Sequence, residues 1–415
     1  MKFLSKEDPK IFELIKEETL RQQSGLIMIP SENFASPAVL EAMATPLNNK
    51  YAEGYPNARY YTGNQFIDQI ESLAISRAKE LFKADHVNVQ PHSGTGANLA
   101  VYFGLLKPGD KIMSLSLPHG GHLSHGSKVS LVGQTYNIIH YAVDQKTELI
   151  DMDQVRELAL KEKPQLIITG STAYPRQFDF QAFSQISQEV GAIQLADVSH
   201  IVGLCLAGLH PDPVAFADVV TTTTHKTLRG PRSAIILCKE KYASQIDKAV
   251  FPGIQGGPFE HVIAAKAVCF KEAMTEHYLN DQKQTVKNAQ ALAQVFLSNG
   301  LRLVSGGTDT HLILIDCTNL NITGKQAANT LAECDIYANF NTIPFETRSP
   351  FDPSGLRIGT PALTTQGMKE KEMELIGQAI CDVLKNSMNA NMKAKAKSLV
   401  KGLTQKFPIY SDLKF

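Results

Sequence analysis

Two charged residues that directly follow apolar runs are the first candidates for chemistry. Lys226 lies in TTTTHKTLRGPR, residues 221–232, and Asp197 lies in AIQLADVSH. Ligand sites form at the carboxyl ends of parallel strands, and a lysine that is partly desolvated there gains the lowered pKa that Schiff-base chemistry needs. A carboxylate beside a pyridine nitrogen keeps that nitrogen protonated. Taken singly, Lys226 would be a surface lysine and Asp197 a capping residue, but as a pair they indicate a site for a pyridine-ring cofactor.

Two glycine-containing turns could bind a phosphate. In VNVQPHSGTGANLAVYFGLL, Ser93, Gly94 and Thr95 lead into an apolar helix, where backbone N–H groups and hydroxyls would face an anion. In FPGIQGGP, Gly256 and Gly257 offer a second backbone surface for close anion approach. Each stretch taken singly could equally be an ordinary turn.

Arg357 is a candidate for binding a carboxylate. It lies in SPFDPSGLRIGTPA, between Gly355 and Gly359. An arginine held among glycines can present its planar fork to a carboxylate in two parallel hydrogen bonds, so the substrate would be an amino or keto acid. A structural ion pair explains the same pattern equally well.

The elements around these residues predict an α/β fold. Short β-rich runs alternate with helical patterns up to about residue 240, which indicates a mostly parallel sheet covered on both faces. The runs are HVNVQ, KIMSLSL, YNIIHYAV, QLIITGS, AIQLADV, DVVTTTT and AIILCK. Apolar spacing predicts helices over 65–82 and 262–277. A helix over 282–299, a strand at HLILIDC, a helix over 324–334 and terminal helices indicate a smaller α/β domain.

The whole chain has the composition of a globular protein. At 415 residues it exceeds what one core usually supports, so we expect two domains. Its 41 basic and 41 acidic residues imply no general attraction to nucleic acid or to an anionic membrane. Six dispersed cysteines argue against a metal site or a disulfide framework, and the charged N-terminal segment is neither a signal peptide nor a membrane span. A cytoplasmic enzyme is expected.

Taken in order, these stretches resemble serine hydroxymethyltransferase over essentially the whole chain. The strings that carry the resemblance are SENF, NKYAEGYP, RYY, VQPHSG, HGGHLSHG, DVSHIVGL, AGLHP, ADVVTTTTHKTLRGPR, VFPGIQGGP, SGGTD, NTIPF, SPF and RIGTPA. The resemblance implies the aspartate-aminotransferase type of pyridoxal-phosphate fold, fold type I. It further implies an N-terminal helix and arm over 1–50, a large cofactor-binding domain over 51–277, a small domain over 278–415, and a homodimer with shared active sites.

The activity implied by the resemblance is reversible conversion of serine and tetrahydrofolate to glycine and 5,10-methylenetetrahydrofolate, through a pyridoxal-phosphate aldimine and a glycine carbanion. Such an enzyme serves one-carbon metabolism and glycine biosynthesis. A specialised relative is the alternative, either a transferase for α-methylserine or a folate-independent aldolase for β-hydroxy amino acids. A binding or structural protein descended from such an enzyme is the contrasting class.

Carried over by resemblance, the cofactor site has Lys226 as the Schiff-base lysine and Asp197 opposite the pyridine nitrogen. His122 would stack on the ring, and Thr172 and His200 would contact its phenolic oxygen. The phosphate would be surrounded by Ser93, Gly94, Thr95 and His225, with Tyr51 and Gly257 contributed by the neighbouring subunit.

The resemblance also implies the substrate residues. Arg357 would bind the amino-acid carboxylate with help from Ser31 and Tyr61, and Glu53 of the neighbouring subunit would be the acid/base group. The positions that match folate contacts are Leu117, Gly121, His122, Leu123, Asn341, Ser349, Pro350 and Phe351.

Several positions depart from the family pattern. Ser233-Ala234 stands for Gly-Gly after GPR, and Thr95-Gly96 stands for Ser-Gln in the phosphate turn. The other departures are Pro30 for Ala, Thr62 for Gly, Thr310 for Asn and Phe340 for Lys. None of them removes a residue assigned above to the core chemistry, but they lie near the substrate and folate regions, where the choice between the alternatives would be made.

Overall fold

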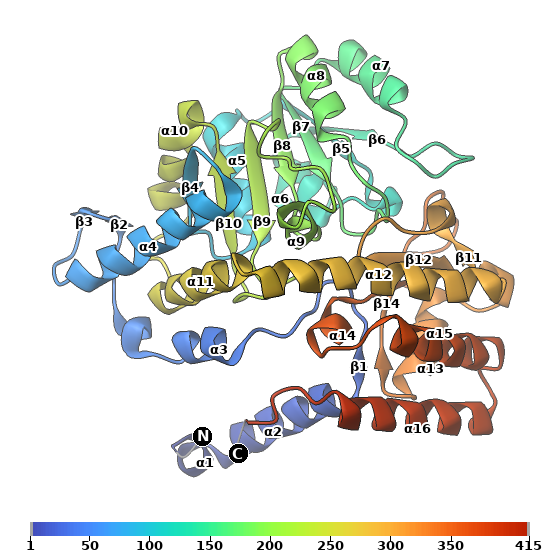
Figure 1. Ribbon diagram of the computed structural model, residues 1–415. Coiled ribbons are helices and arrows are strands. Elements are labelled where there is room, and N and C mark those ends of the chain that lie inside the picture. Colours follow the sequence, from blue (N-terminus) through green and yellow to red (C-terminus); the bar gives the residue numbers. More distant parts are fainter. Residues whose placement is uncertain (1–2, 413–415) are drawn as a thin grey trace. The chain divides into compact units, whose positions relative to one another are not determined.

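The computed structural model describes residues 3–412, which form two compact units (Figure 1). One unit comprises residues 33–283, and the other comprises the chain up to residue 32 together with the chain from residue 284 onward. The domain boundaries expected from the sequence, at residues 50 and 277, stay a prediction. Each unit is described below by itself.

The unit of residues 33–283 is built on a seven-stranded sheet, which confirms the predicted α/β class. The strand order is β4-β10-β9-β8-β7-β5-β6. The bounds are β4 His86–Asn88, β5 Lys111–Leu115, β6 Asn137–Tyr141, β7 Leu166–Gly170, β8 Ile193–Asp197, β9 Val219–Thr223 and β10 Ala234–Cys238. Only β10 runs against its neighbours β4 and β9, so the carboxyl ends of the other six strands share one edge.

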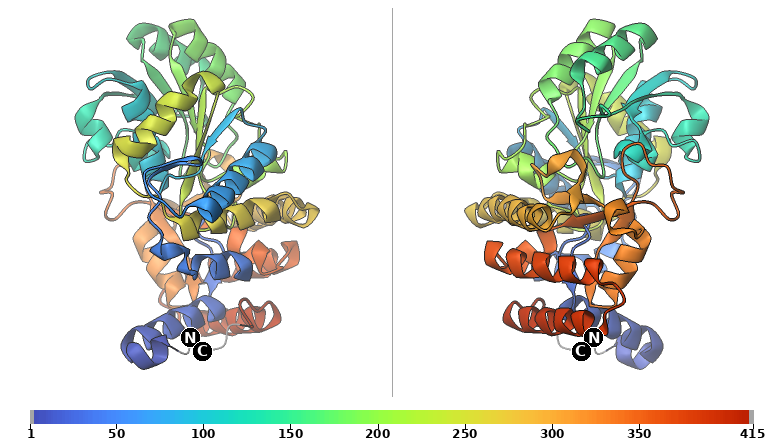
Figure 2. Two further views of the ribbon diagram at one scale, coloured as in Figure 1. Left: turned by 90° about the vertical axis from the view of Figure 1, so that its left-hand side faces the viewer. Right: turned by 90° about the vertical axis from the view of Figure 1, so that its right-hand side faces the viewer.

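Alternating side chains of the strands build a core on each face of this sheet. In β10, Ile235 and Leu237 join the cluster that packs under α4, α8 and α11, whereas Ala234 and Ile236 join the cluster under α5 and α10. Figure 2 shows helices on both sides of the strands. The helices of this unit are α3 Pro37–Met43, α4 Gln65–Phe82, α5 Gly94–Leu105, α6 Leu131–Thr135, α7 Met152–Glu162, α8 Phe180–Val190, α9 Val202–Leu206, α10 Ala243–Lys248 and α11 Glu260–Ala273.

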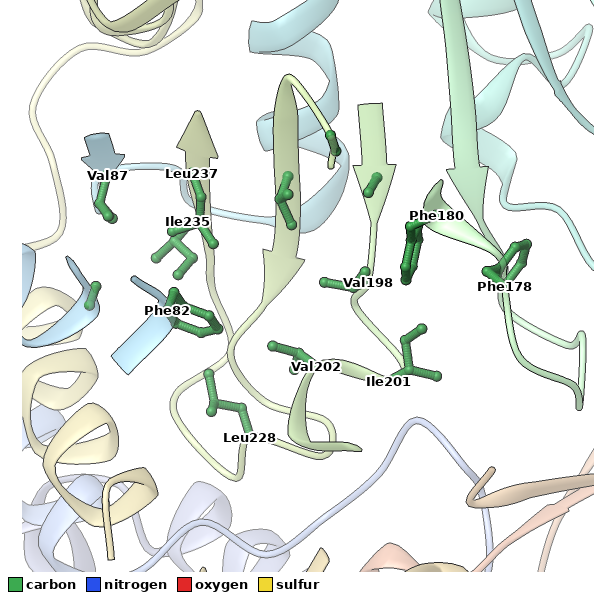
Figure 3. Close-up of a cluster of buried hydrophobic side chains, with 14 of the residues drawn as sticks. Phe82, Val87, Phe178, Phe180, Val198, Ile201, Val202, Leu228, Ile235 and Leu237 are labelled. Atoms are coloured by element: carbon green, nitrogen blue, oxygen red, sulfur yellow. The ribbon is translucent and has the colours of Figure 1, made fainter. Parts of the chain in front are cut away.

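The segments that follow β8 and β9 are anchored in the larger of these clusters. Val198 comes directly after β8, and Leu228 lies in the turn after β9 (Figure 3). Both side chains are almost fully buried. Apolar burial therefore fixes the backbone on either side of the polar residues at this edge of the sheet.

The other unit has its own four-stranded antiparallel sheet, ordered β11-β12-β15-β14. The bounds are β11 Arg302–Leu303, β12 Leu312–Asp316, β14 Asn339–Asn341 and β15 Gly355–Gly359, and β1 Leu26–Ile27 pairs with β13 Ile336–Tyr337. Its helices are α1 Leu4–Glu7, α2 Pro9–Ser24, α13 Gly324–Ala332, α14 Pro361–Thr365, α15 Glu370–Lys385 and α16 Ala390–Lys406. Helix α12, Glu276–Ser298, begins among the residues of the first unit and ends among those of the second.

Some local structure differs from the sequence-based expectation. The helix expected over 262–277 is α11, which ends at Ala273, followed by the start of α12 at Glu276. The segment between α2 and α4, expected to be irregular, contains α3 and the short hairpin of β2 Gly54–Tyr55 and β3 Ala58–Arg59. Within residues 3–412, no helix combines the length and the apolarity needed to cross a bilayer.

Candidate functional site

The carboxyl edge of the seven-stranded sheet collects most of the predicted cofactor residues. Asp197 is the last residue of β8, and its register partner on β9 is Thr221. Lys226 follows β9 by three residues, and Thr172 follows β7 by two. Ser93 and His122 come after β4 and β5. Parallel strands therefore bring together side chains that are more than a hundred residues apart in the chain.

Asp197 is held by a full set of donors. Its Oδ2 accepts from Asn98 Nδ2 at 2.9 Å and is paired with His125 Nε2 at 3.0 Å. Its Oδ1 accepts from the Ser199 hydroxyl at 2.6 Å and from the Ser199 N–H at 3.1 Å. Asn98 is itself fixed, because its Oδ1 accepts from the Thr221 hydroxyl at 2.7 Å. The carboxyl group thus has one orientation.

These donors set the charge of Asp197. Burial acts to raise the pKa of its carboxyl, but the hydrogen bond from His125 and the electrostatic influence of His125 and His122 outweigh burial and hold the pKa far below its usual range. The Nδ1 of His125 accepts the His122 N–H at 3.4 Å, so its Nε2 carries the proton that is donated to Asp197. Asp197 is a buried, ionised carboxylate.

His122 and Thr172 lie in adjoining loops of this edge. The His122 Nδ1 is 2.7 Å from the Ser124 hydroxyl, and the His122 and His125 rings meet edge to face at 5.5 Å. The Thr172 hydroxyl donates to the Gly121 carbonyl at 3.1 Å, which ties the turn after β7 to the turn after β5. These contacts fix both loops before any ligand binds.

The predicted phosphate turn opens α5. The Ser93 hydroxyl caps the helix by accepting from the Gly96 N–H at 3.1 Å. A Cβ at Gly94 would lie 2.7 Å from Cγ2 of Thr223, so only glycine fits where α5 begins beside the end of β9. The helix N-terminus thus lies against the strand that leads to Lys226.

His225 adds a buried ring to this neighbourhood. Burial, with the nearby charges of Lys226 and Arg232, lowers the pKa of His225 to about 3. Within residues 3–412 its Nδ1 is buried without a hydrogen-bond partner. Burying a polar atom without a hydrogen bond destabilises the fold unless a bound ligand supplies the missing partner.

The turn that carries Lys226 is rigid. The Lys226 carbonyl accepts from Asn33 Nδ2 at 3.2 Å and from the Arg229 N–H at 3.1 Å. Arg229 adopts a left-handed backbone, with φ of 60°, and its guanidinium pairs with Asp281 at 2.8 Å. The backbone on both sides of the lysine is therefore determined by the fold.

This edge fits the pyridoxal phosphate that the resemblance implies. Asp197 supplies an ionised carboxylate suited to a protonated pyridine nitrogen, and Ser93 with Gly94 supplies a helix N-terminus that close packing keeps free of a Cβ. His225 supplies a buried ring nitrogen without a partner. Lys226 supplies an amine from the neighbouring turn.

A second group of predicted residues clusters around the β2–β3 hairpin. The Tyr51 and Tyr61 rings meet edge to face at 5.1 Å, and 56% and 45% of these side chains are exposed. A Cβ at Gly256 would lie 3.2 Å from Glu53 Oε1, and one at Gly257 would lie 3.4 Å from the Tyr51 ring. Partial desolvation and the Glu53 charge raise the pKa of Tyr61. One chain thus assembles these five residues on its surface.

Buried side chains clamp the backbone around Glu53. Arg59 Nη1 donates to the Ala52 carbonyl at 2.8 Å and to the Gly54 carbonyl at 3.0 Å. Gln90 Nε2 also donates to the Gly54 carbonyl, at 2.9 Å. The Glu71 carboxylate then accepts from both donors, at 2.6 Å from Arg59 and 2.7 Å from Gln90. Glu53 is therefore presented from a fixed backbone.

In the other unit, Arg357 lies in the middle of β15 between Leu314 of β12 and Asn339 of β14. Its Nε donates to Asn339 Oδ1 at 3.1 Å. Burial lowers the pKa of Arg357 to about 10, which leaves the guanidinium charged at neutral pH. The geometry gives the guanidinium a fixed orientation through Asn339.

The segment that carries Ser31 lies against the same strand. A Cβ at Gly359 would lie 2.7 Å from the Cα of Pro30, and the Gly359 N–H donates to the Met28 carbonyl at 2.8 Å. The departure at Pro30 is therefore accommodated because position 359 is glycine. Ser31 follows Pro30 directly and is half-buried.

The predicted folate residues divide between the two units. Leu117, Gly121 and Leu123 belong to the seven-stranded unit, where both leucines are exposed. Asn341 ends β14 of the other unit, and the loop beyond it carries Ser349, Pro350 and Phe351, of which Phe351 is 82% exposed. Exposed apolar side chains in both groups are available to contact a ligand.

Four residues with evident positioning roles were not predicted: Asn98, His125, Ser199 and Asn339. Asn98 is the one polar residue in NLAVYFGLL, a signal that could have marked it. His125 and Ser199 lie within the recognised strings HGGHLSHG and DVSH. Asn339 lies on β14 opposite Arg357 of β15, and neither strand was predicted, so no sequence signal placed the two residues together.

Comparisons with known proteins agree with this site. The family model described as serine hydroxymethyltransferase matches residues 4–380. A serine hydroxymethyltransferase of Methanosarcina barkeri (strain Fusaro / DSM 804) is 56% identical over 411 residues, which are 99% of this chain and 100% of that protein. One of Coprothermobacter proteolyticus is 56% identical over 403 residues, 97% of each chain. The chain therefore belongs to the serine hydroxymethyltransferase family: it is a pyridoxal-phosphate enzyme that interconverts serine and glycine with tetrahydrofolate as co-substrate.

Proposed function

We propose that the carboxyl edge of the seven-stranded sheet performs this reaction, with Lys226 as the residue that attaches the cofactor covalently and Asp197 as the partner of its ring nitrogen. The observation that carries the assignment is the ionised, fully bonded state of Asp197. Pyridoxal phosphate, when bound, supplies an electron sink for the bond-breaking step. Asp197 holds the proton on the ring nitrogen that makes this sink effective. The names of both relatives favour serine as the hydroxymethyl donor over α-methylserine, and transfer to folate over the folate-independent aldolase reaction.

The remaining residues of this edge bind and orient. Ser93, Gly94, Thr95 and His225 hold the phosphate, supported by the capping geometry and by the unpartnered Nδ1 of His225. His122 covers the ring, with its orientation fixed by Ser124. Thr172 and His200 face the phenolic oxygen.

Arg357 binds the carboxylate of the amino acid, assisted by Ser31 and Tyr61. The support is the buried but charged guanidinium, which a hydrogen bond from its Nε to Asn339 orients. Folate is bound by Leu117, Gly121, His122 and Leu123, together with Asn341 and the loop of Ser349, Pro350 and Phe351.

Glu53 moves the proton at the substrate hydroxyl, and it does so for the site of a second subunit, together with Tyr51 and Gly257. The support is that these side chains cluster on the surface around a clamped hairpin. Helix α2 also exposes Ile11, Leu14, Ile15 and Leu20, as expected of a face that a partner covers. The enzyme is then a homodimer with shared sites.

A reducing compartment fits the six cysteines, because none of them is paired and five are buried. We therefore place the enzyme in the cytoplasm, within one-carbon metabolism and glycine biosynthesis.

Covalent trapping tests the assignment of Lys226. Borohydride reduction of the holoenzyme, followed by peptide mass analysis, should place the added cofactor mass on the peptide that contains Lys226. Lys226→Ala should show no trapped cofactor, whereas Lys241→Ala, at an exposed lysine, should behave like the wild type. Attachment at another lysine would refute the assignment.

Subunit complementation tests the shared site. Glu53→Gln and Lys226→Ala should each be inactive, and a refolded mixture should regain up to about a quarter of the wild-type activity, because half of the dimers then contain one intact site. A mixture of Asp197→Asn with Lys226→Ala should stay inactive, since both residues serve the same chain. No recovery in the first mixture would mean that Glu53 acts within its own chain.

A further inference from the structure

The carbonyl of Pro91 is an unusual meeting point of donors at the start of the phosphate turn. It accepts from the Ser233 hydroxyl at 2.9 Å, from Lys266 Nζ at 3.2 Å and from the Ala234 N–H at 3.4 Å. Ser233 and Lys266 are both almost fully buried. If this carbonyl rotated, the buried Ser233 hydroxyl would lose its acceptor and Lys266 Nζ would lose one of its three acceptor carbonyls, which is costly.

Ser233 also contacts the turn that carries Lys226. Its carbonyl accepts from the Thr224 N–H at 3.0 Å. One buried residue thus bonds the phosphate turn through its hydroxyl and the Lys226 turn through its backbone.

The sheet topology explains why Ser233 can do this. The phosphate turn follows β4 and Lys226 follows β9, but these strands are not neighbours, because β10 lies between them. Since β10 runs antiparallel to both, its first residue lies at the edge where β4 and β9 end. Ser233 directly precedes β10 and therefore spans the gap between the two turns.

We propose that Ser233 is a positioning residue, whose hydroxyl sets the spacing between the phosphate turn and the Lys226 turn so that both can engage one cofactor molecule. This inference rests on the proposed roles of Ser93 and Lys226. The residue itself does not touch the reacting atoms.

Three probes distinguish spacing from a simple loss of structure. Pyridoxal phosphate engages both turns, pyridoxal engages the Lys226 turn, and inorganic phosphate engages the phosphate turn. In Ser233→Ala, equilibrium dialysis of the apo-protein should show pyridoxal phosphate bound about 3- to 10-fold more weakly, the range expected for one hydrogen bond, with pyridoxal and phosphate affinities unchanged. The turnover number at saturating cofactor should stay within about twofold of the wild type. Ser233→Gly should give the same result.

The controls separate this inference from the function on which it rests. Ser187→Ala removes another buried hydroxyl, one without a hydrogen-bond partner within residues 3–412, and should leave all three affinities unchanged. Ser93→Ala should weaken both phosphate and pyridoxal phosphate. Suppose that Ser93→Ala has this effect. The spacing role is then refuted if both Ser233 variants bind pyridoxal phosphate normally, or if they bind all three probes more weakly by the same factor. If Ser93→Ala has no effect, the phosphate turn itself is wrongly assigned and the inference falls with it.

Discussion

Asp197 and Glu260 are both buried carboxyl groups of the seven-stranded unit, yet their protonation states are opposite. Asp197 receives donors from Asn98, His125 and Ser199, and its pKa lies far below the usual range. Glu260 opens α11, and within residues 3–412 neither of its carboxyl oxygens has a hydrogen-bond partner. Burial, with the charge of Glu71 nearby, raises the pKa of Glu260 to about 8.

The difference teaches that partners, rather than burial, decide whether a buried acid carries charge. Where we propose that the chemistry needs a fixed negative charge, at the end of β8, the chain supplies several donors. Beside the clamped hairpin, Glu71 is already paired with Arg59, and Glu260 is neutral at pH 7. The predictions below would break or sharpen this contrast.

The largest effect is expected from removing the charge of Asp197. Asp197→Asn keeps the shape but loses the ionic partner of the ring nitrogen, a change of about 3–5 kcal/mol for a buried pair, so turnover with serine and tetrahydrofolate should fall at least about 100-fold. Steady-state kinetics at saturating pyridoxal phosphate measure this. Asp151→Asn is the matched control, because Asn caps α7 as well as Asp does. A loss below tenfold would show that the charge is dispensable.

His125 should have the next largest effect, because it donates to Asp197 and holds its charge. Removing a hydrogen bond to a charged group costs about 1.5–3 kcal/mol, so His125→Ala should lower turnover about 10- to 100-fold. His125→Gln can still donate from an amide and should recover part of this loss. If the Ala and Gln variants were equally impaired, the ring would act by filling space.

Glu260 should affect stability rather than catalysis. Its pKa is raised by folding, so the folded state binds more protons than the unfolded state, and the group's stabilisation is lost as pH rises toward 8. The groups that face it are Glu71, Arg59, Asp68 and Lys266. In the wild type, Glu260 should make the free energy of unfolding fall by up to about 1.4 kcal/mol per pH unit between pH 5 and 7. Glu260→Gln should not show this contribution to the fall.

Chemical denaturation at several pH values measures this slope. The window stops at pH 7 because burial lowers the pKa of Lys266 to about 7, and a lowered lysine pKa makes stability rise with pH above that value. Glu157→Gln, at an exposed glutamate of α7, should keep the wild-type slope. Equal slopes in the wild type and Glu260→Gln would mean that Glu260 is ionised in the folded protein.

The sequence predicted the strands that carry the site, because runs such as AIQLADV and DVVTTTT are apolar or β-branched over their whole length. It did not predict β15, since GLRIG has glycine at both ends and a charged residue in its middle. The roles of Lys226 and Asp197 followed from strand ends and resemblance. The bonds of Asn98 and His125 to Asp197 could not be predicted, because they join residues 72 and 99 positions apart through side-chain geometry that periodicity does not encode.

Ser199 should have the smallest effect of the series. Its hydroxyl donates to Asp197 Oδ1 at 2.6 Å, but its own N–H donates to the same oxygen at 3.1 Å and survives in Ser199→Ala. Turnover should therefore fall only about 2- to 10-fold, less than in His125→Ala, because the N–H keeps Oδ1 hydrogen-bonded. Ser187→Ala, which removes a buried hydroxyl without a partner in residues 3–412, should leave turnover unchanged. A loss in Ser199→Ala as large as that in Asp197→Asn would mean that the Ser199 hydroxyl, which donates to Oδ1, keeps Asp197 ionised. The donors to Oδ2, Asn98 and His125, would then not be sufficient.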